Sequence, residues 1–313
     1  DAAVSVGHTG ASLAAATFGL DRLRGVTRPA VAVLVPTLDG DVVLLEAGDA
    51  VPADARWLCE LGVTNAQGRP REGMADKLRQ VQRFAELLTP LINEAFPEAR
   101  PEGAPSLRLV DAGRGKGYLT FALAEVLGAR ARIIGIELRP ALVELCNRVA
   151  RDCGWETRLG FVAGGIKEVP TTGCDGLIAL HACDTATDDA LALGITAGAR
   201  LLVVAPCCQK ELRPQLSAPP VLADALRHGI FQERQSEFVT DALRAQLLEW
   251  AGYKTKVFEF IATEHTAKNL MISAIRTRLA GTPDEAKAQR LRAFASFYGI
   301  RQHALAHHLT FSL

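Results

Sequence analysis

The middle of the chain alternates short apolar runs with longer amphipathic stretches. The apolar runs predict strands at residues 107–111, 132–137, 157–162, 175–180 and 200–205. The amphipathic stretches predict helices near 117–127, 140–153, 185–196 and 237–251. Alternation of strands and helices is typical of a parallel sheet that is covered by helices on both faces.

The pattern changes after the last of these helices. Residues 254–261 and 269–276 are strand-like, and they predict a hairpin that adds an antiparallel edge to the sheet. Residues 283–310 are predicted to be helical again, with a break at Gly299. We therefore expect a helical tail over residues 281–313.

The start of the chain has a different organisation. Val31–Pro36 and Val42–Glu46 are apolar runs joined by the letters LDGD, which predicts a hairpin. The polar stretch Asn65–Gly73 is interpreted as a linker, and residues 74–95 form an amphipathic helical pattern. The expected division is a small α+β region at 1–73 for substrate recognition or interaction, a main domain at 74–280 and the tail.

Composition narrows the class of protein. Apolar residues make up 49% of the 313 residues, and 35 basic residues balance 35 acidic ones, so no general polyanion-binding surface is indicated. The seven scattered cysteines form no CxxC pair, which predicts reduced thiols in a cytoplasmic enzyme. Because no apolar stretch reaches the roughly 20 residues of a membrane helix, no membrane partner is expected.

The most informative motif is a glycine-rich turn between two predicted strands. The first strand ends in Asp111, glycines follow at alternate positions, and the next strand ends in Glu137. This order builds a nucleoside pocket at the carboxyl ends of strands. Glu137 is placed to accept both ribose hydroxyls, and Asp111 can accept hydrogen bonds from turn amides or from a ligand amino group. The helix that begins near Gly117 offers free N–H groups to a ligand carboxylate.

The glycine spacing favours S-adenosylmethionine over a dinucleotide. A dinucleotide turn needs a third glycine where this chain has Tyr118. Another nucleotide, or a turn without ligand, remains an alternative. Ile166, after the glycine pair Gly164 and Gly165, is expected either to pack on the adenine or to belong to the core. The predicted cofactor contacts are Asp111, Gly113, Gly115, Gly117, Tyr118, Glu137, Leu138, Ile166 and His181.

Two segments after later strands are candidates for the acceptor side. His181 follows the fourth central strand and is either a general base that orients the acceptor or a structural histidine. Asp184 is the second candidate base, and Asp184 or Thr185 is also expected to cap the next helix. The catalytic candidates are thus His181 and Asp184.

The fifth central strand leads into an unusual Pro-Cys-Cys-Gln segment. Its thiols can be packing groups, can line the acceptor pocket, or can bind a metal with His181, Cys183 or His265. Because the spacing matches no standard zinc motif, no metal is predicted. A polar turn near residue 265 is either solvated or close to the cleft. The predicted acceptor pocket comprises Cys183, Cys207, Cys208, Gln209, His265, Lys268 and Asn269.

A local basic cluster bears on the partner. It comprises Arg69, Arg71, Lys77, Arg79 and Arg83. Such a cluster is either a solvated helix face or a contact for an anionic substrate or RNA. RNA and protein therefore both remain possible acceptors, and the oligomeric state is open.

Five motifs in order resemble one family. They read DAGRGKGYLTFAL, GIELRP, LHACDTATDDAL, APCCQKEL and EHTAKNLMISAIR, within Ala75–Arg276. They resemble the class I S-adenosylmethionine-dependent methyltransferase domain family that contains eukaryotic methyltransferase-like proteins. The resemblance implies an α/β, Rossmann-like, seven-stranded and mostly parallel sheet with an antiparallel C-terminal hairpin. It also implies S-adenosyl-L-methionine as cofactor.

The acceptor does not follow from the resemblance. Some family members carry labels for ribosomal RNA adenine dimethylation, but this chain lacks the Asn/Asp-Pro-Pro-aromatic tetrapeptide after the fourth strand. The implied function is methyl transfer to an unidentified acceptor, which can be RNA, protein or a small molecule. A non-catalytic cofactor-binding interaction module is the alternative, and a nicotinamide oxidoreductase is a third hypothesis that the glycine spacing disfavours.

Overall fold

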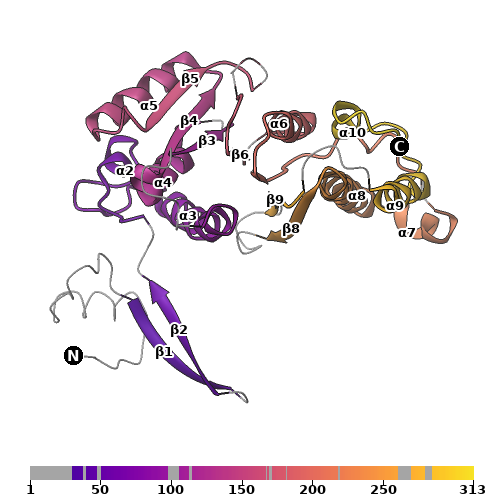
Figure 1. The fold of residues 1–313 in the computed structure, drawn as a ribbon, viewed down its shortest axis with the longest axis horizontal. Coiled ribbons are helices and arrows are strands. Elements are labelled where there is room, and N and C mark those ends of the chain that lie inside the picture. Colours follow the sequence, from indigo (N-terminus) through magenta and orange to yellow (C-terminus); the bar gives the residue numbers. More distant parts are fainter. Residues whose placement is uncertain are drawn as a thin grey trace. The chain divides into compact units, whose positions relative to one another are not determined.

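The computed structural model divides the chain into two compact units, Asp1–Pro52 and Ala53–Leu313 (Figure 1). In the first unit the structure describes the backbone of two strands and residues 51 and 52. In the second unit it describes residues 53–97, 106–112, 115–166, 168, 171–180, 182–217, 219–259, 269–278 and 284–313.

The first unit contains an antiparallel hairpin. Strands β1 (Ala30–Thr37) and β2 (Gly40–Ala47) pair from Ala30 opposite Ala47 to Thr37 opposite Gly40. This pairing confirms the hairpin that the two apolar runs predict.

The second unit is built on a seven-stranded sheet. Its strands are β3 (Leu107–Asp111), β4 (Ala131–Glu137), β5 (Leu159–Ala163), β6 (Gly176–Ala179), β7 (Leu201–Val204), β8 (Tyr253–Glu259) and β9 (Leu270–Arg276). They lie in the order β5-β4-β3-β6-β7-β9-β8. The first five are parallel, and β9 runs antiparallel to both β7 and β8. The predicted fold class, a mostly parallel Rossmann-like sheet with an antiparallel C-terminal hairpin, is confirmed.

Helices alternate with these strands. They are α2 (Arg56–Glu60), α3 (Ala75–Ala95), α4 (Tyr118–Leu127), α5 (Pro140–Asp152), α6 (Thr185–Thr196), α7 (Ala223–Leu226), α8 (Gly229–Trp250), α9 (Glu285–Phe297) and α10 (Ala304–His308), with short 3₁₀ turns η1 (Gly128–Arg130) and η2 (Pro220–Leu222). Every residue of β6 and β7 is buried. Such complete burial is expected of central parallel strands covered by helices, and it explains their unbroken apolar sequences.

One large apolar core joins the sheet to the later helices. Leu177 and Leu202 of the central strands pack in it with Leu243 of α8, Leu291 of α9 and Leu305 of α10. The C-terminal helices therefore belong to the same compact unit as the sheet, whereas the sequence predicts a separate tail over residues 281–313.

The segment after Pro52 also packs within the second unit. The Trp57 ring stacks on Phe121 of α4 with ring centroids 5.6 Å apart, and its Nε1 donates to the Glu125 carboxylate at 3.2 Å. The division between the units at Pro52 and Ala53 thus differs from the predicted boundary at 73/74, because buried residues of α2 precede the polar linker.

The start of one helix also differs from the predicted one. Helix α8 begins at Gly229, although the sequence pattern predicts its start at 237, because no side chain between 229 and 235 is buried. Burial along α8 begins at Ser236, and the first buried apolar residue is Val239. Among the described residues, no helix combines the length and the hydrophobicity that crossing a membrane requires.

Candidate functional site

The turn from β3 into α4 has a backbone that requires glycine. Gly115 has φ 128° and Gly117 has φ 62°, and glycine adopts such positive angles without the clash of a Cβ. A Cβ on Gly117 would also lie 2.6 Å from the ring of Phe161. Gly117 directly precedes the first helical residue of α4, so the free N–H groups of that helix face the turn. Gly113 and Arg114 lie outside the described residues.

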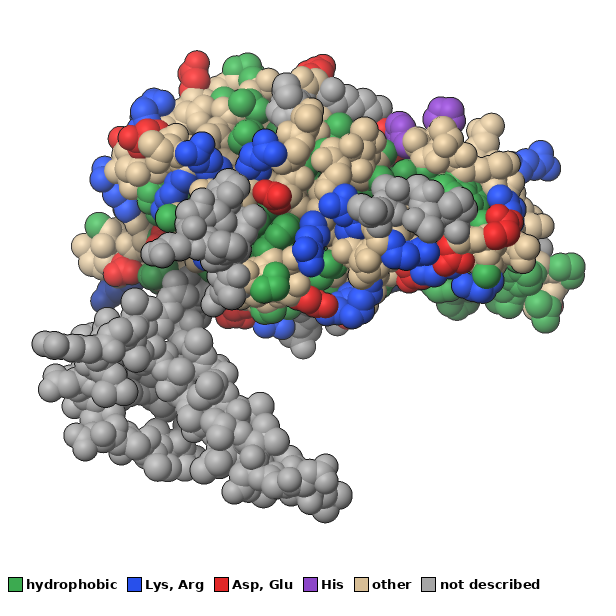
Figure 2. Space-filling model, viewed as in Figure 1, with side chains coloured by type: hydrophobic (Ala, Val, Ile, Leu, Met, Phe, Trp, Pro, Cys, Tyr) green, Lys and Arg blue, Asp and Glu red, His purple; other side chains and the backbone are tan. Residues whose placement is uncertain are grey.

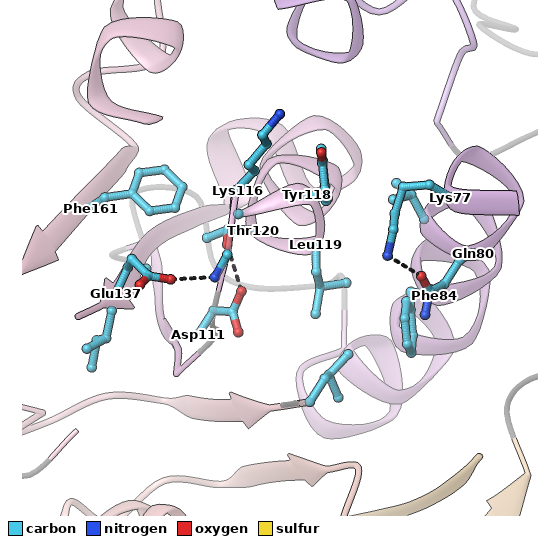
Figure 3. A pocket seen from close by; sticks show the side chains of 16 residues that line it. Lys77, Gln80, Phe84, Asp111, Lys116, Tyr118, Leu119, Thr120, Glu137 and Phe161 are labelled. Atoms are coloured by element: carbon cyan, nitrogen blue, oxygen red, sulfur yellow. Dashed lines mark hydrogen bonds between the residues drawn. The ribbon is translucent and has the colours of Figure 1, made fainter. Parts of the chain in front are cut away.

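A pocket opens beside this turn (Figure 3). Its walls come from α3, from the turn and start of α4, and from the strands β3, β4 and β5. The lining residues are Lys77, Gln80, Val81, Phe84, Asp111, Gly115, Lys116, Gly117, Tyr118, Leu119, Thr120, Gly135, Ile136, Glu137, Phe161 and Leu180. Five of the predicted cofactor contacts therefore line one cavity.

Asp111 is a buried carboxylate, and only one of its two oxygens accepts a hydrogen bond from the described residues. It is 3% exposed, and the Thr120 hydroxyl donates to its Oδ2 at 2.6 Å. Within the part of the chain that the structure describes, Oδ1 has no hydrogen-bond partner. Burial raises the pKa of Asp111 to about 6, against the opposing effect of the Thr120 hydrogen bond. A buried anionic oxygen of this kind is stabilised by a cationic or N–H donor on a ligand.

Glu137 is a buried carboxylate, and each of its two oxygens accepts two hydrogen bonds. Its Oε1 accepts from the backbone N–H of Arg139 at 3.0 Å and from Arg139 Nε at 2.8 Å. Its Oε2 accepts from the backbone N–H of Gly115 and from Arg139 Nη2, the latter at 3.2 Å. The Arg139 side chain is the largest cause that lowers the pKa of Glu137 to about 2. Glu137 thus ties the glycine turn to the tip of β4 as a charged group.

Helix α3 supplies a wall that sequence reasoning did not foresee. In Figure 3, Lys77, Gln80 and Phe84 point from α3 toward the pocket. Lys77 Nζ donates to Gln80 Oε1 at 2.5 Å and lies 5.8 Å from the centroid of the Tyr118 ring. Burial lowers the pKa of Lys77. The pattern identifies the buried face of α3, but only the tertiary contact between α3 and α4 shows that this face borders a pocket.

A second, smaller pocket adjoins the first. It is lined by Ala112, Ile136, Leu138, Gly164, Gly165, Ile166, Ala182 and Ala186. Ile136 lines both pockets. Ile166 is half-buried and packs against the large core, as one of its two interpretations expects, whereas its packing on adenine stays a prediction. Leu138 and Ile166, the remaining predicted cofactor contacts among the described residues, lie here.

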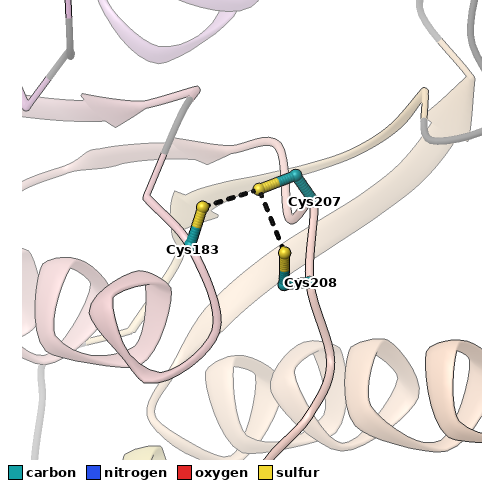
Figure 4. A group of neighbouring side chains, drawn as sticks. All are labelled: Cys183, Cys207 and Cys208. Carbon is teal, nitrogen blue, oxygen red and sulfur yellow. Dashed lines mark hydrogen bonds between the residues drawn. The ribbon is translucent and has the colours of Figure 1, made fainter.

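Three predicted acceptor residues come together at the adjacent strand ends (Figure 4). Cys183 follows β6, and Cys207 and Cys208 follow β7. Cys183 Sγ is 3.1 Å from Cys207 Sγ, and Cys207 Sγ is 3.8 Å from Cys208 Sγ. Burial raises the pKa of the Cys207 thiol.

The Asp184 carboxylate links the segment after β6 to the segment after β7. Asp184 occupies the position before α6, but its carboxylate makes no cap bond to that helix. Its Oδ1 instead accepts from the backbone N–H groups of Lys210 at 2.9 Å and Glu211 at 3.1 Å. The expected side-chain cap by Asp184 is therefore wrong, and the carboxylate joins the segment after β6 to the segment after β7.

The other predicted acceptor residues are placed differently. Gln209 is buried, and its Nε2 donates to Asp241 Oδ2 at 3.0 Å. Asn269 is buried just before β9. His181, which is the first catalytic candidate, lies outside the described residues, as do His265 and Lys268.

The basic cluster is largely paired with its own neighbours. Arg79 contacts Asp76, and Arg83 Nη1 lies 3.0 Å from Glu86 Oε2. Arg71 Nε donates to the carbonyl of Thr64 at 3.0 Å. On the face shown in Figure 2, acidic side chains stand among the basic ones. Arg71, Arg79 and Arg83 thus each have a partner close in sequence, and a contact of the cluster with a substrate stays a prediction.

Comparison with known families divides the chain in two. Residues 76–215 match a family described as a methyltransferase domain. Residues 1–67 match a family described as a fatty acid synthesis protein. The second match was not foreseen from the sequence pattern, which indicates only a hairpin in this region.

The curated relatives are phosphate acyltransferases. The protein of Desulforudis audaxviator is 49% identical over 63 residues, which are 20% of this chain and 19% of that protein. The protein of Xanthobacter autotrophicus is 29% identical over 181 residues, 52% of this chain and 48% of that protein. The chain thus spans half or less of the length of these relatives.

Among solved structures, the O-methyltransferase from Bacillus cereus in complex with SAH is similar over 72% of this chain and 93% of its own, at 11% identity and a TM-score of 0.44. The stretch that matches the methyltransferase domain, residues 76–215, contains the glycine turn and the five parallel strands β3 to β7.

Proposed function

We propose that the second unit is an S-adenosylmethionine-dependent methyltransferase. The observation that carries the proposal is the pairing of two buried acids, Asp111 and Glu137, at the tips of adjacent strands around a glycine turn. Asp111 presents an oxygen with no partner among the described residues, and Glu137 sits directly beneath the turn. The match of this segment to a methyltransferase domain supports the same conclusion.

Each part of the cofactor has a suitable group in this proposal. The bound cofactor supplies an electrophilic methyl group on a positively charged sulfur. Asp111 Oδ1 accepts from the amino group, and the N-terminal N–H groups of α4 receive the carboxylate. Glu137 accepts the ribose hydroxyls once the exposed Arg139 side chain moves aside. Leu138 and Ile166 border the adenine in the smaller pocket.

The chain's main contribution to transfer is positioning. A pocket that holds the acceptor at near-attack distance from the methyl group can lower the activation barrier by about 7–11 kcal/mol. A base is needed only for an acceptor that is protonated at the working pH. From its place in the sequence, His181 is the proposed base. Asp184 is assigned no proton transfer, because its Oδ1 already accepts two backbone N–H groups.

The first unit is proposed to recognise substrate or a partner. Residues 1–67, which include this unit, match a family described as a fatty acid synthesis protein. The acyl transfer named for the curated relatives is not part of the present proposal, because so small a share of their length is represented.

The experiment measures cofactor binding and turnover separately. Titration calorimetry with S-adenosylmethionine tests binding, and transfer of labelled methyl groups into fractionated RNA, protein and metabolite pools tests catalysis. Glu137→Ala should lose binding, whereas Glu144→Ala, which changes an exposed glutamate on α5, should retain it. Binding without transfer to any pool would favour the alternative of a non-catalytic binding module. Absence of binding in the unmodified protein would refute the proposal.

A further inference from the structure

Three thiols from two separate segments converge beyond the ends of β6 and β7. These strands are parallel neighbours, with Ala179 opposite Val204. The cysteines that follow them are 24 residues apart in sequence, yet the Sγ atoms of Cys183, Cys207 and Cys208 all lie within 4.8 Å of one another. Figure 4 shows the three side chains directed toward a common point.

The backbone around the first thiol is held in an uncommon conformation. Asp184, next to Cys183, has φ 52° and ψ −126°, a region that residues other than glycine adopt only with steric strain. The Asp184 carboxylate accepts from the backbone N–H of Lys210 in the segment after β7. The Asp184 carbonyl accepts from Arg244 Nη2 at 2.9 Å. Surrounding bonds therefore impose the strain that brings Cys183 beside Cys207.

The segment that bears the other two thiols is anchored on α8. The Gln209 carbonyl accepts from Ser236 Oγ at 2.8 Å, and the Gln209 amide donates to Asp241. Asp241 in turn lies 3.0 Å from the fully buried Arg244, the same residue that holds Asp184. Both thiol-bearing segments thus depend on one buried cation, which makes the cluster a preorganised arrangement.

The donor set and its exposure suit a soft metal ion. Thiolates select zinc and copper(I) over hard cations. Cys183 is exposed and its two partners are half-buried, so one side of the cluster is open to solvent. Sulfur atoms bound to one tetrahedral zinc ion lie about 3.8 Å apart. The pair Cys207 and Cys208 already has this spacing, and Cys183 reaches it with a movement of less than about 1 Å.

We propose that Cys183, Cys207 and Cys208 bind one thiophilic metal ion, with Zn²⁺ as the probe ion and water in the fourth position. Binding displaces the thiol protons to solvent and involves no change of oxidation state. The site stands independently of the proposed methyltransferase activity, because none of its ligands lines the cofactor pocket. It also departs from the sequence-based expectation of no metal, which rested on spacing alone.

The test uses the full chain, purified under reducing conditions and dialysed against limiting Zn²⁺. Metal analysis should find about one ion per chain. Substitution by Co²⁺ should give a thiolate-to-metal charge-transfer absorption band. Cys183→Ser, Cys207→Ser and Cys208→Ser should each weaken the metal affinity at least about tenfold. Cys153→Ser, at a half-buried thiol outside the cluster, should leave it unchanged.

Two results would overturn the proposal. One is a reduced, folded protein that holds no ion and shows no charge-transfer band with Co²⁺. The other is metal binding that survives all three cluster substitutions. Circular dichroism and urea unfolding of the same samples show whether each variant is folded, and cofactor titration then tests the proposed function separately, so failure of the metal site is distinguishable from failure of the proposed function.

Discussion

Arg139 lies across Glu137, with its Nε 2.8 Å from Oε1 and its Nη2 3.2 Å from Oε2. The guanidinium therefore occupies the directions in which the carboxylate is proposed to accept ribose hydroxyls. The carboxylate is 4% exposed, whereas the Arg139 side chain is 61% exposed and free to move into solvent. The pair implies a competition between an exposed arginine and the cofactor for one buried acid.

Removing the competitor should strengthen cofactor binding slightly. Arg139→Ala leaves the backbone N–H contacts of Glu137 in place and removes the guanidinium that occupies its carboxylate oxygens. We expect the Kd for S-adenosylmethionine, measured by titration calorimetry, to fall by up to about fivefold. Arg148→Ala, an exposed arginine on α5, is the control. A Kd that rises tenfold or more would mean that Arg139 contacts the ligand itself.

The charge of Asp111 should make cofactor binding depend on pH. Its pKa is raised from 3.8 to about 6, so the unpaired oxygen becomes fully anionic only above about pH 6. Affinity for the cationic amino group should rise with pH through that value in the unmodified protein. In Asp111→Asn the affinity should be weaker and flat across the same range. An identical pH profile in both proteins would remove Asp111 from the site.

The raised pKa of Asp111 should also make the free energy of unfolding depend on pH. Between about pH 4 and pH 6 the native state holds the Asp111 proton while the unfolded chain has released it. The free energy of unfolding therefore falls as pH rises through this window, by up to about 3 kcal/mol from this residue. Urea unfolding of Asp111→Asn should show a correspondingly smaller fall. A steeper fall in the variant would contradict the raised pKa.

Arg244 should be critical for stability. It is fully buried between Asp188, at 2.6 Å, and Asp241, at 3.0 Å. Arg244→Ala leaves two buried carboxylates without their cation, and we expect a loss of about 3–5 kcal/mol in urea unfolding. Arg234→Ala removes a more exposed ion pair with Glu237 and should cost less than about 1 kcal/mol. Equal losses in the two variants would refute the central role of Arg244.

The glycine turn was predictable because its signal is local. Asp111, Gly115, Gly117 and Glu137 lie within a short stretch whose strand, turn and helix patterns are each plain, and all four line the pocket. The parallel direction of the central strands follows similarly from the alternation of strands and helices, which does not by itself determine their order in the sheet.

Features that depend on distant contacts could not be predicted in the same way. Lys77 and Phe161 reach the pocket from elements far from the turn in sequence. The spacing of Cys183 and Cys207 matches no metal motif, and only the pairing of β6 with β7 brings their thiols together. The boundary between the units was missed because Trp57, in a short helix without strong periodicity, is buried against α4.

The central claim is that the pocket at the glycine turn binds S-adenosylmethionine through Asp111 and Glu137. The most direct measurement is titration calorimetry of the unmodified chain, Glu137→Ala and Glu144→Ala with the cofactor and with its demethylated product. The account predicts one site per chain in the unmodified protein and in Glu144→Ala, and at least about tenfold weaker binding in Glu137→Ala, because hydrogen bonds to a charged group are lost. Equal affinity in all three proteins, or no binding by a folded unmodified chain, would contradict it.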